Sequence, residues 1–235
     1  MTTMRDAWRL ATGTLTALPV RPPTRVDRRT ARTAMLLAPL AVLPLGVLVA
    51  MLLWLGGLTS LPPLAVAFVA VGALAVGSRA LHWDGLSDVA DGLTASYDRE
   101  RSLAVMKTGT SGPAGVTATV VVAGTQAAAL TAYSHSIALA ALAGALVCLS
   151  RCALWVVCCT RVPAARADGL GVTYTRTVPL PVAVLGGVLL SVTGGLAVLV
   201  LVRRATTRFG GVTGDVFGAA IELALATMLL TWAWL

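Results

Sequence analysis

The sequence predicts an all-α polytopic integral membrane protein with about six transmembrane helices and a short N-terminal interfacial helix. Of the 235 residues, 57% are hydrophobic and only 12% are charged, and the mean hydropathy is +0.85. Soluble domains carry roughly a quarter charged residues. Long uncharged runs alternate with short polar segments, and each run can supply one or two spans of ~20 residues. This composition excludes a disordered chain, a disulfide scaffold and a soluble globular enzyme.

The first 33 residues form a basic segment that we expect at the cytoplasmic surface or at the membrane interface. They carry seven Arg and two Asp, a formal charge of +5. Residues 4–18 are predicted to form a helix that is too short to span and lies at the interface. Prolines follow it in the segment 19–33. The remaining residues, 34–235, are expected to form a single transmembrane domain.

The uncharged runs predict six spans. Residues 33–78 hold no charged side chain, and a glycine pair at 56–57 and a proline pair at 62–63 interrupt this run. The run therefore yields two spans joined by a tight turn. The same reasoning divides the rest of the chain. The predicted spans are 34–56, 62–79, 114–133, 137–160, 178–202 and 216–235.

Basic residues near the ends of the spans favour a cytoplasmic N-terminus. This orientation places 79–113 and 161–176 in the cytoplasm and the polar break at 134–136 outside. Simple alternation would put 203–215 outside as well, yet that segment carries three arginines. Either the apolar run 178–202 does not cross cleanly or the rule fails here, and the two glycine pairs of this run would permit a broken or re-entrant helix.

The formal net charge of +8 is explained by membrane topology. In a membrane protein, basic residues concentrate in the loops on the cytoplasmic side of the lipid bilayer. We therefore expect no nucleic-acid partner.

The most informative polar stretch contains three aspartates, Asp84, Asp88 and Asp91, spaced four and three residues apart. On a helix these residues lie within about 60° of one another and share one face. Three ionised carboxylates so close repel one another, and a divalent cation would relieve the repulsion. Oxygen ligands favour a hard ion, Mg²⁺ or Mn²⁺. The alternative is a solvated acidic face on a loop helix.

Other polar residues could complete a phosphate site. Lys107 precedes a loop of glycines and hydroxyl residues whose backbone N–H groups can cradle phosphate, although a plain turn has the same composition. Arg79 and Arg151 lie at the end of or inside apolar runs, where they either snorkel or face a polar site. Asp215 and Glu222 are seven residues apart and share a helical face. Glu222 within an apolar span is a functional candidate, the alternative being a carboxylate paired with a nearby arginine.

These residues together fit phosphoryl-type transfer. A metal would bridge diphosphate oxygens, and Arg or Lys would hold the remaining charge. A carboxylate or His82 would orient or deprotonate an attacking hydroxyl. The residues thus indicate a metal-dependent membrane transferase acting on a diphosphate, and they leave its substrate open.

Several blocks of the sequence resemble the cobalamin synthase family, the adenosylcobinamide-GDP ribazoletransferases. The stretch 82–93, HWDGLSDVADGL, closely resembles the family motif H-x-D-G-L-x-D-x-x-D-G. The stretch 210–222, GGVTGDVFGAAIE, matches G-G-x-T-G-D-x-x-G-A-x-x-E. Less specific blocks agree in order: LTALPV at 15–20, Met106-Lys107 with the glycines that follow, Arg151, and Ala165-Arg166 with GLG at 169–171.

The resemblance implies a Mg²⁺-dependent integral membrane enzyme of late cobalamin synthesis, with 34–235 as its catalytic domain. Such an enzyme joins adenosylcobinamide-GDP to α-ribazole or its 5′-phosphate and releases GMP. The product is adenosylcobalamin or its phosphate. The expected location is the bacterial cytoplasmic membrane, with the active site on the cytoplasmic side. Association with other cobalamin-assembly enzymes is compatible with this interpretation, but no sequence feature indicates it.

The resemblance implies that Asp84, Asp88 and Asp91 bind Mg²⁺ and diphosphate. Asp215 and Glu222 are second candidates for metal binding or hydroxyl activation. The candidate phosphate contacts are Lys107, Arg151 and Arg166, with Arg79 as a further basic candidate. One departure concerns Thr108, which follows Met106-Lys107 where the family often has Asp. One acidic ligand is therefore missing from this loop or supplied elsewhere.

Three rival classes fit less well. A CDP-alcohol phosphotransferase would have Ala-Arg soon after the first Asp-Gly, whereas Leu86-Ser87-Asp88 follows Gly85 here. A membrane prenyltransferase of the aspartate-rich type has a different acidic spacing and a different nucleophile. A transporter or channel would distribute its acidic residues over several spans, whereas five of the ten acids here lie in the segment 79–113.

Overall fold

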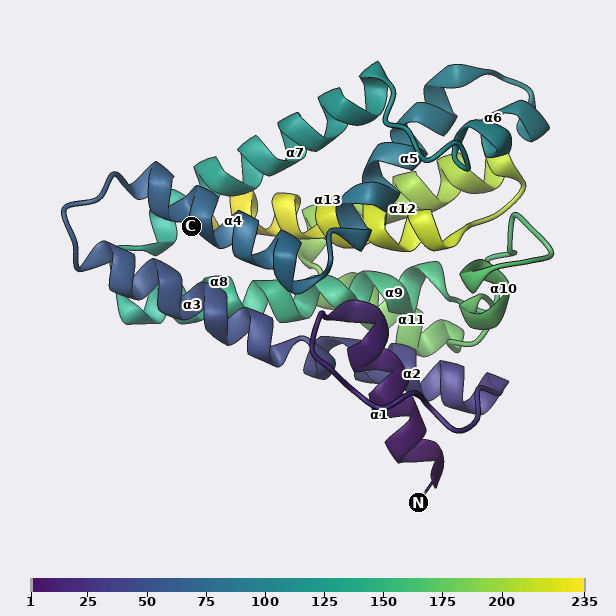
Figure 1. Ribbon diagram of the computed structural model, residues 1–235, viewed down its shortest axis with the longest axis horizontal. Helices are drawn as coiled ribbons and strands as arrows, with labels where there is room; N and C mark the ends of the chain where they lie inside the picture. Colours follow the sequence, from purple (N-terminus) through teal and green to yellow (C-terminus); the bar gives the residue numbers. More distant parts are fainter. Residues whose placement is uncertain (1, 235) are drawn as a thin grey trace.

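The computed structural model describes residues 2–234 and confirms the all-α prediction (Figure 1). The only β-type pairings in this part of the chain are two isolated bridges, Cys159 with Val178 and Ala164 with Val212. The α-helices are α1 (Thr2–Leu15), α2 (Arg28–Ala41), α3 (Leu43–Gly57), α4 (Pro63–Gly77), α5 (Leu81–Ala95), α6 (Arg99–Val105), α7 (Pro113–Leu130), α8 (Ile137–Leu149), α9 (Ala153–Val157), α10 (Leu170–Tyr174), α11 (Leu180–Leu189), α12 (Ser191–Phe209) and α13 (Gly214–Ala233). Two 3₁₀ turns, η1 (Thr131–Tyr133) and η2 (Ser150–Cys152), extend α7 and join α8 to α9.

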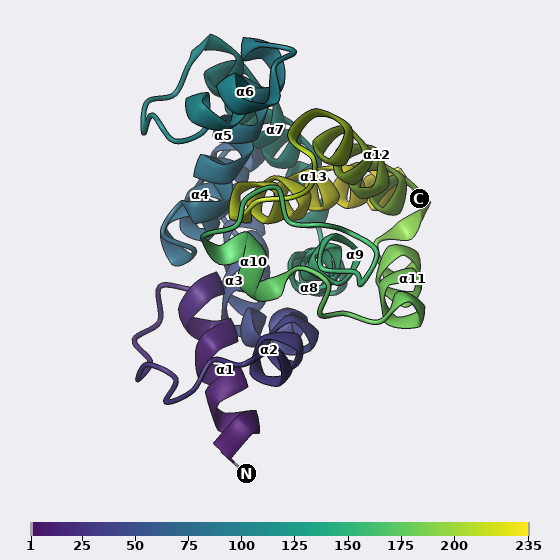
Figure 2. The same cartoon turned by 90° about the vertical axis from the view of Figure 1, so that its right-hand side faces the viewer.

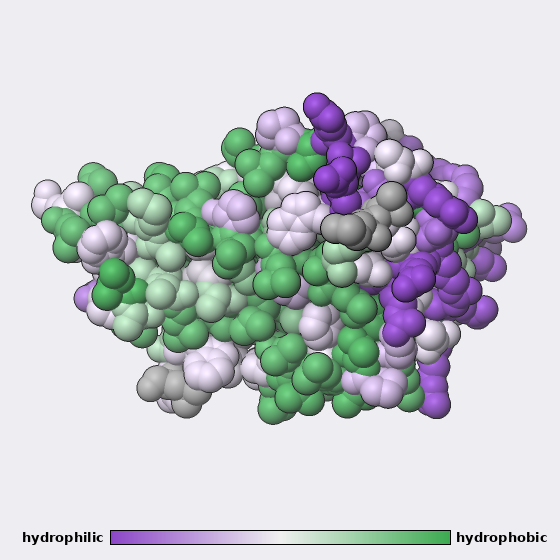
Figure 3. Space-filling view, turned by 90° about the horizontal axis from the view of Figure 1, so that it is seen from below, coloured by the Kyte–Doolittle hydropathy of each residue, from purple (hydrophilic) through white to green (hydrophobic). Residues whose placement is uncertain are grey.

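Within residues 2–234, four helical segments are long and apolar enough to cross a membrane, and α4 with α5 counts as a fifth if that bent pair forms one span. The four are Arg28–Gly57, Pro113–Tyr133, Ile137–Val157 and Gly214–Ala233. Many large apolar side chains on these helices and their neighbours face outward, which is the pattern of a lipid-facing surface. Figure 3 shows this apolar surface covering most of one face, with hydrophilic residues gathered at one end.

The hydrophilic end, here called the polar end, is formed by α6, α10 and the loops 96–98, 106–112, 158–169 and 210–213 (Figure 2). Arg99 holds three of its segments together, because its guanidinium donates to the carbonyl of Phe209 at 2.7 Å and to the carbonyl of Ala165 at 2.8 Å. Arg208 donates to the carbonyl of Ser96 and stacks over the Tyr97 ring at 4.6 Å. The opposite end holds the turns at 58–62 and 134–136 (Figure 1).

The predicted span 178–202 is not one helix. Helix α11 has ten residues, or about 15 Å, which is half of a hydrocarbon core of ~30 Å. The chain then reverses at Ser191, whose φ of 64° lies in the left-handed region. A Cβ on Gly195 would lie 2.6 Å from the Gly187 carbonyl oxygen, so the two arms of this hairpin touch through their backbones.

This hairpin explains the three arginines that conflicted with simple alternation. Helix α12 returns to the polar end, where Arg208 and Phe209 contact the loop before α6 and α6 itself. The segment 203–215 therefore lies at the same end as 161–176. Simple alternation places it at the opposite end, because it treats the two arms of this hairpin, α11 and α12, as one complete span.

A sharp bend separates α4 from α5. The two helices meet at 92°, and the residues at the corner, Arg79 and Ala80, both have positive φ values, 56° and 55°. Non-glycine residues seldom adopt this conformation, so tertiary contacts must hold it. One such contact is the Arg79 guanidinium, which donates to the Gly13 carbonyl of α1. Because α5 runs nearly perpendicular to α4, it lies outside the direction of the spans and crosses the polar end of the bundle (Figure 1).

The hairpin of α11 and α12 predicts the sidedness of residue 204. In a variant without native cysteines, a cysteine at Arg204 should react with a membrane-impermeant maleimide from the same face as a cysteine at Glu100. A cysteine at Ser60 should react only from the other face. Labelling of sealed vesicles of both orientations tests this. Reaction of residue 204 from the face of residue 60 would contradict the hairpin and restore a complete span at 178–202.

Candidate active site

The contact between α5 and α13 positions the acidic residues. At Gly85, an added Cβ would lie 2.6 Å from the Asp215 carbonyl oxygen, and at Gly218 it would lie 2.8 Å from His82 Cα. Each helix thus places a glycine against the backbone of the other, as close helix packing requires. The approach brings Asp84 and Asp88 of α5 beside Asp215 in the first turn of α13. These residues come from two motifs that lie far apart in the sequence.

The like charges in this group affect one another. Asp88 is half-buried, and burial together with Asp84, Asp215 and Asp91 raises the pKa of its carboxyl to about 6, while Arg166 opposes the shift. Neither Asp84 nor Asp88 takes part in an ion pair within residues 2–234. The group therefore carries negative charge that protein side chains balance only in part.

Asp91 has a different role from the other two aspartates of its motif. Its two carboxylate oxygens accept hydrogen bonds from the backbone N–H groups of Gly112 at 2.7 Å and Gly115 at 2.8 Å. Gly112 is the residue before α7 and Gly115 lies in its first turn, where N–H groups have no helical partner. Asp91 thereby fixes the loop that follows Lys107 onto α5, and the geometry alone gives it a structural task.

A polar cavity of about 130 Å³ adjoins the acidic group. Arg166, Asp168 and Asp215 line it together with the N-terminal turn of α13. Thr213, the residue before α13, donates from its hydroxyl to Asp215 at 3.0 Å. Lys107 reaches the rim through an exposed ion pair of 3.7 Å with Asp168. Of the predicted phosphate contacts, Arg166 and Lys107 therefore lie at this site.

Glu222 lies in a separate, buried cluster. The residue is 4% exposed, its Oε1 lies 3.4 Å from His82 Nδ1, and its Oε2 accepts a hydrogen bond of 2.8 Å from Gln126. Gln126 also donates to the Glu222 carbonyl at 3.2 Å. Glu222 thus joins α13 to α5 and α7 in the core, about two helical turns from Asp215.

The structure does not bring Arg151 or Arg79 to the acidic group. Arg151 is 1% exposed in η2, where its guanidinium donates to the Val147 carbonyl at 2.8 Å and to the Ser150 hydroxyl at 2.9 Å. Arg79 is occupied at the α4–α5 corner. An apolar run can bury an arginine within the bundle, and the sequence does not show which way the side chain points.

Within residues 2–234, no three His, Cys, Asp or Glu side chains converge closely enough to hold a metal ion as they stand. The donor set is nevertheless of one chemical kind. Asp84, Asp88 and Asp215 offer only carboxylate oxygens, the ligands that Mg²⁺ prefers, and Mg²⁺ usually takes one or two carboxylates and completes its shell with water and phosphate oxygens.

Comparison with known proteins decides the family. The model of the Cobalamin-5-phosphate synthase family matches residues 7–233. The chain belongs to the cobalamin-5-phosphate synthase family. An adenosylcobinamide-GDP ribazoletransferase from Nocardioides sp. is 76% identical over 98% of this chain and 99% of its own length. Proteins of the same name from Frankia casuarinae and Brucella canis are 37% and 33% identical, over 93% and 82% of this chain. No solved structure matches the chain.

For this member of the cobalamin-5-phosphate synthase family, sequence reasoning missed two residues of the site region. Gln126 supports Glu222, but a lone glutamine in an apolar span gives no spacing signal. Arg99 secures the polar end, yet in the sequence it is one of several basic residues in 79–113. Both act through contacts with residues at least 66 positions away, which only the fold reveals.

The glycine contact predicts that Gly85→Ala lowers activity. The new methyl group would push α5 from α13 and displace Asp84 and Asp88 from Asp215. A displacement near 1 Å can slow turnover by about 100-fold, so we expect the variant to turn over roughly 10- to 100-fold more slowly than the wild type. Gly72→Ala is the matched control, because nothing lies within 4 Å of a Cβ there. Equal turnover by the two variants would show that this contact does not position the acidic group.

The α7 cap predicts that Asp91→Asn destabilises the protein. An amide replaces one acceptor by a donor that faces a backbone N–H, and an unsatisfied buried group costs about 1–3 kcal/mol. The thermal unfolding midpoint in detergent, measured without Mg²⁺, should fall. Glu100→Gln, a change at an exposed carboxylate on α6, should leave the midpoint unchanged. An unaltered midpoint for Asp91→Asn would mean that the cap contributes nothing to stability.

Proposed function

We propose that this protein joins adenosylcobinamide-GDP to α-ribazole, or to its 5′-phosphate, in a Mg²⁺-dependent reaction that releases GMP. The observation that carries the proposal is the full-length match to a family whose curated relatives are named adenosylcobinamide-GDP ribazoletransferase. The geometry supports it, because the two motifs meet in one acidic group beside a cavity that Arg166 and the α13 N-terminus line.

The reaction transfers the cobinamide phosphoryl group from GMP to a ribose hydroxyl of the acceptor. A ribose hydroxyl of the acceptor attacks the phosphorus next to cobinamide, the bond to the bridging oxygen breaks, and GMP leaves with that oxygen. Arg166, Lys107 and the N–H groups at the start of α13 would hold the diphosphate charge. His82, supported by Glu222, or one of the carboxylates would orient the hydroxyl and accept its proton.

Asp84 and Asp88 would hold Mg²⁺, with Asp215 as the further carboxylate in place of the capping Asp91. When bound, such an ion neutralises diphosphate charge and stabilises the leaving group. Asp215 belongs to the other motif and stands next to Asp84 and Asp88, so it can offset the acid that Thr108 does not supply in the Lys107 loop.

The proposed location is the bacterial cytoplasmic membrane, with the polar end facing the cytoplasm. The basis is the positive charge of that end, which carries basic residues from α6, the loop 161–176 and the end of α12. A cytoplasmic site would also give direct access to nucleotide substrates.

The test is GMP release by purified protein in lipid vesicles. Supplied with adenosylcobinamide-GDP and α-ribazole, the protein should release GMP only when both substrates and Mg²⁺ are present. Because Asp88 is a proposed metal ligand, Asp88→Ala should slow release at least about 100-fold, whereas Glu100→Ala should retain the wild-type rate. Replacing α-ribazole by its 5′-phosphate identifies the better acceptor. A folded wild-type protein that releases no GMP with either acceptor would refute the proposed reaction.

A further inference from the structure

A second cavity, here called the base pocket, also has a volume of about 130 Å³ and shares Gly214 and Asp215 with the polar cavity. Its other walls come from α1, α2, α5, α9, α10 and α13. Asp84 also belongs to its lining. The two cavities therefore meet at the acidic group, one mainly polar and the other mainly apolar.

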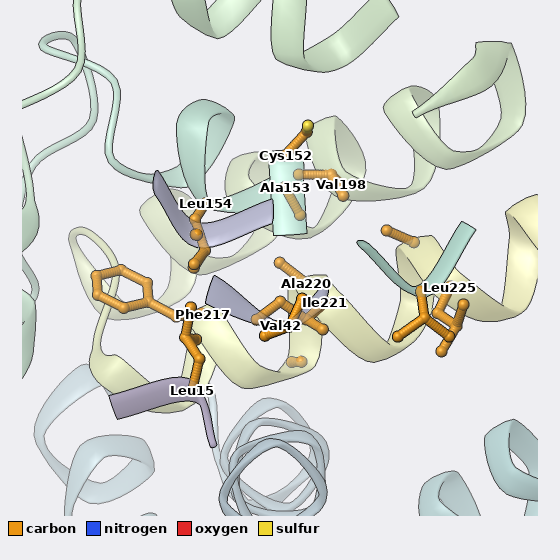
Figure 4. Close-up of a cluster of buried hydrophobic side chains, with 14 of the residues drawn as sticks. Leu15, Val42, Cys152, Ala153, Leu154, Val198, Phe217, Ala220, Ile221 and Leu225 are labelled. Atoms are coloured by element: carbon orange, nitrogen blue, oxygen red, sulfur yellow. The ribbon is translucent and has the colours of Figure 1, made fainter. Parts of the chain in front are cut away.

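Aromatic and aliphatic side chains form the interior of the base pocket. The rings of Tyr174 and Phe217 pack edge to face, with centroids 6.3 Å apart and planes at 70°. Leu154 of α9 and Leu15 of α1 flank Phe217 (Figure 4). Met35 of α2 completes this wall. Tyr174, Leu154 and Met35 are at most 2% exposed, so the pocket is set into the core.

His82 is the polar group buried in the wall of this pocket. It is 5% exposed, and its Nε2 has no hydrogen-bond partner among the described residues. A buried polar atom without a partner costs free energy. A ligand in the pocket that offers one complementary group would remove that cost. The wall therefore fits a ligand that is largely apolar and carries a single hydrogen-bonding position nearby.

The volume limits what can enter. Sites for drug-sized ligands measure roughly 300–1,000 Å³, so a cavity of about 130 Å³ accepts one small ring system and excludes a corrinoid or a whole nucleotide. Two larger grooves, of about 590 and 650 Å³, are lined almost wholly by apolar residues and share no lining residue with the acidic group. Among these cavities, the base pocket alone combines small size and apolar walls with contact to both Asp84 and Asp215.

We propose that the base pocket receives the flat aromatic base of the acceptor nucleoside and that its walls determine which bases are accepted. This inference rests on the transferase function proposed above. The apolar benzimidazole base of ribazole matches walls of Phe217, Leu154 and Met35. The guanine of the donor matches poorly, because its several donors and acceptors would lose their water without gaining partners. With the base enclosed, the ribose lies toward Asp84 and Asp215, and the donor diphosphate occupies the polar cavity.

The first test separates the two substrates kinetically. Phe217→Ala should raise KM for α-ribazole about tenfold, the effect of losing roughly 1.4 kcal/mol of ring contact, and leave KM for adenosylcobinamide-GDP within about twofold. Phe68→Ala is the matched control, because Phe68 lies exposed on α4 outside the pocket. Leu154→Phe, which fills the pocket, should also weaken the acceptor alone.

The second test measures base selectivity, because a general structural defect would not shift the preference toward larger bases. Phe217→Ala should increase the use of a ribonucleoside with a larger base, naphthimidazole, relative to α-ribazole by at least about fivefold, because the lost ring leaves room for one more. Equilibrium binding of radiolabelled α-ribazole without the donor provides a readout independent of turnover, and Phe217→Ala should bind it about tenfold more weakly.

These outcomes distinguish the pocket from the reaction. Wild-type protein that binds α-ribazole but releases no GMP would refute the proposed reaction and leave the pocket assignment standing. Active wild-type protein whose Phe217→Ala and Leu154→Phe variants keep the acceptor KM and base selectivity would overturn the assignment, as expected of a cavity filled by lipid. A rise in the KM of the donor alone would also overturn it and place the donor in the pocket.

Discussion

The backbone contact between α5 and α13 is the constraint on which the rest of the site depends. Because Gly85 and Gly218 have no side chain, each lies directly against the backbone of the other helix, Gly85 against Asp215 and Gly218 against His82. Any side chain at either position would separate the helices. The approach places Asp84 and Asp88 beside Asp215 and sets His82 against Glu222. The two motifs are distant in sequence, and they form one site because neither glycine carries a Cβ that would separate the helices.

The contact needs support from both ends of α5. At its start, the bend of 92° from α4 directs α5 across the polar end, and Arg79 ties this corner to α1. Toward its end, Asp91 caps α7. At the polar end, Arg99 anchors α6 to the segments that precede α10 and α13. Arginine suits this task, because its fork of donors can satisfy two carbonyls that have no helical partner.

The five carboxylates of the two motifs divide by environment into two functions. Asp91 and Glu222 are buried and hydrogen-bonded, so they hold helices together. Asp84, Asp88 and Asp215 remain more accessible and mutually repulsive, which suits them to a cation and phosphate. Around them lie one polar and one apolar cavity that share Asp215. This asymmetry would separate a charged donor end from an aromatic acceptor end within one small site.

The sequence by itself determined the helical membrane class, most of the long apolar helices and the acidic motif, because hydropathy and helical periodicity are local properties. It also singled out Arg166 and Lys107, which the structure places at the polar cavity and its rim. Only the tertiary structure decided that 178–202 folds into a hairpin, because the reversal depends on Ser191 and on contacts of α12 at the polar end. The three aspartates of α5 share one helical face, and the sequence does not show which of them faces a cavity. Asp91 instead binds the N-terminus of α7, because its hydrogen-bond partners Gly112 and Gly115 are distant in sequence and are brought there only by the fold.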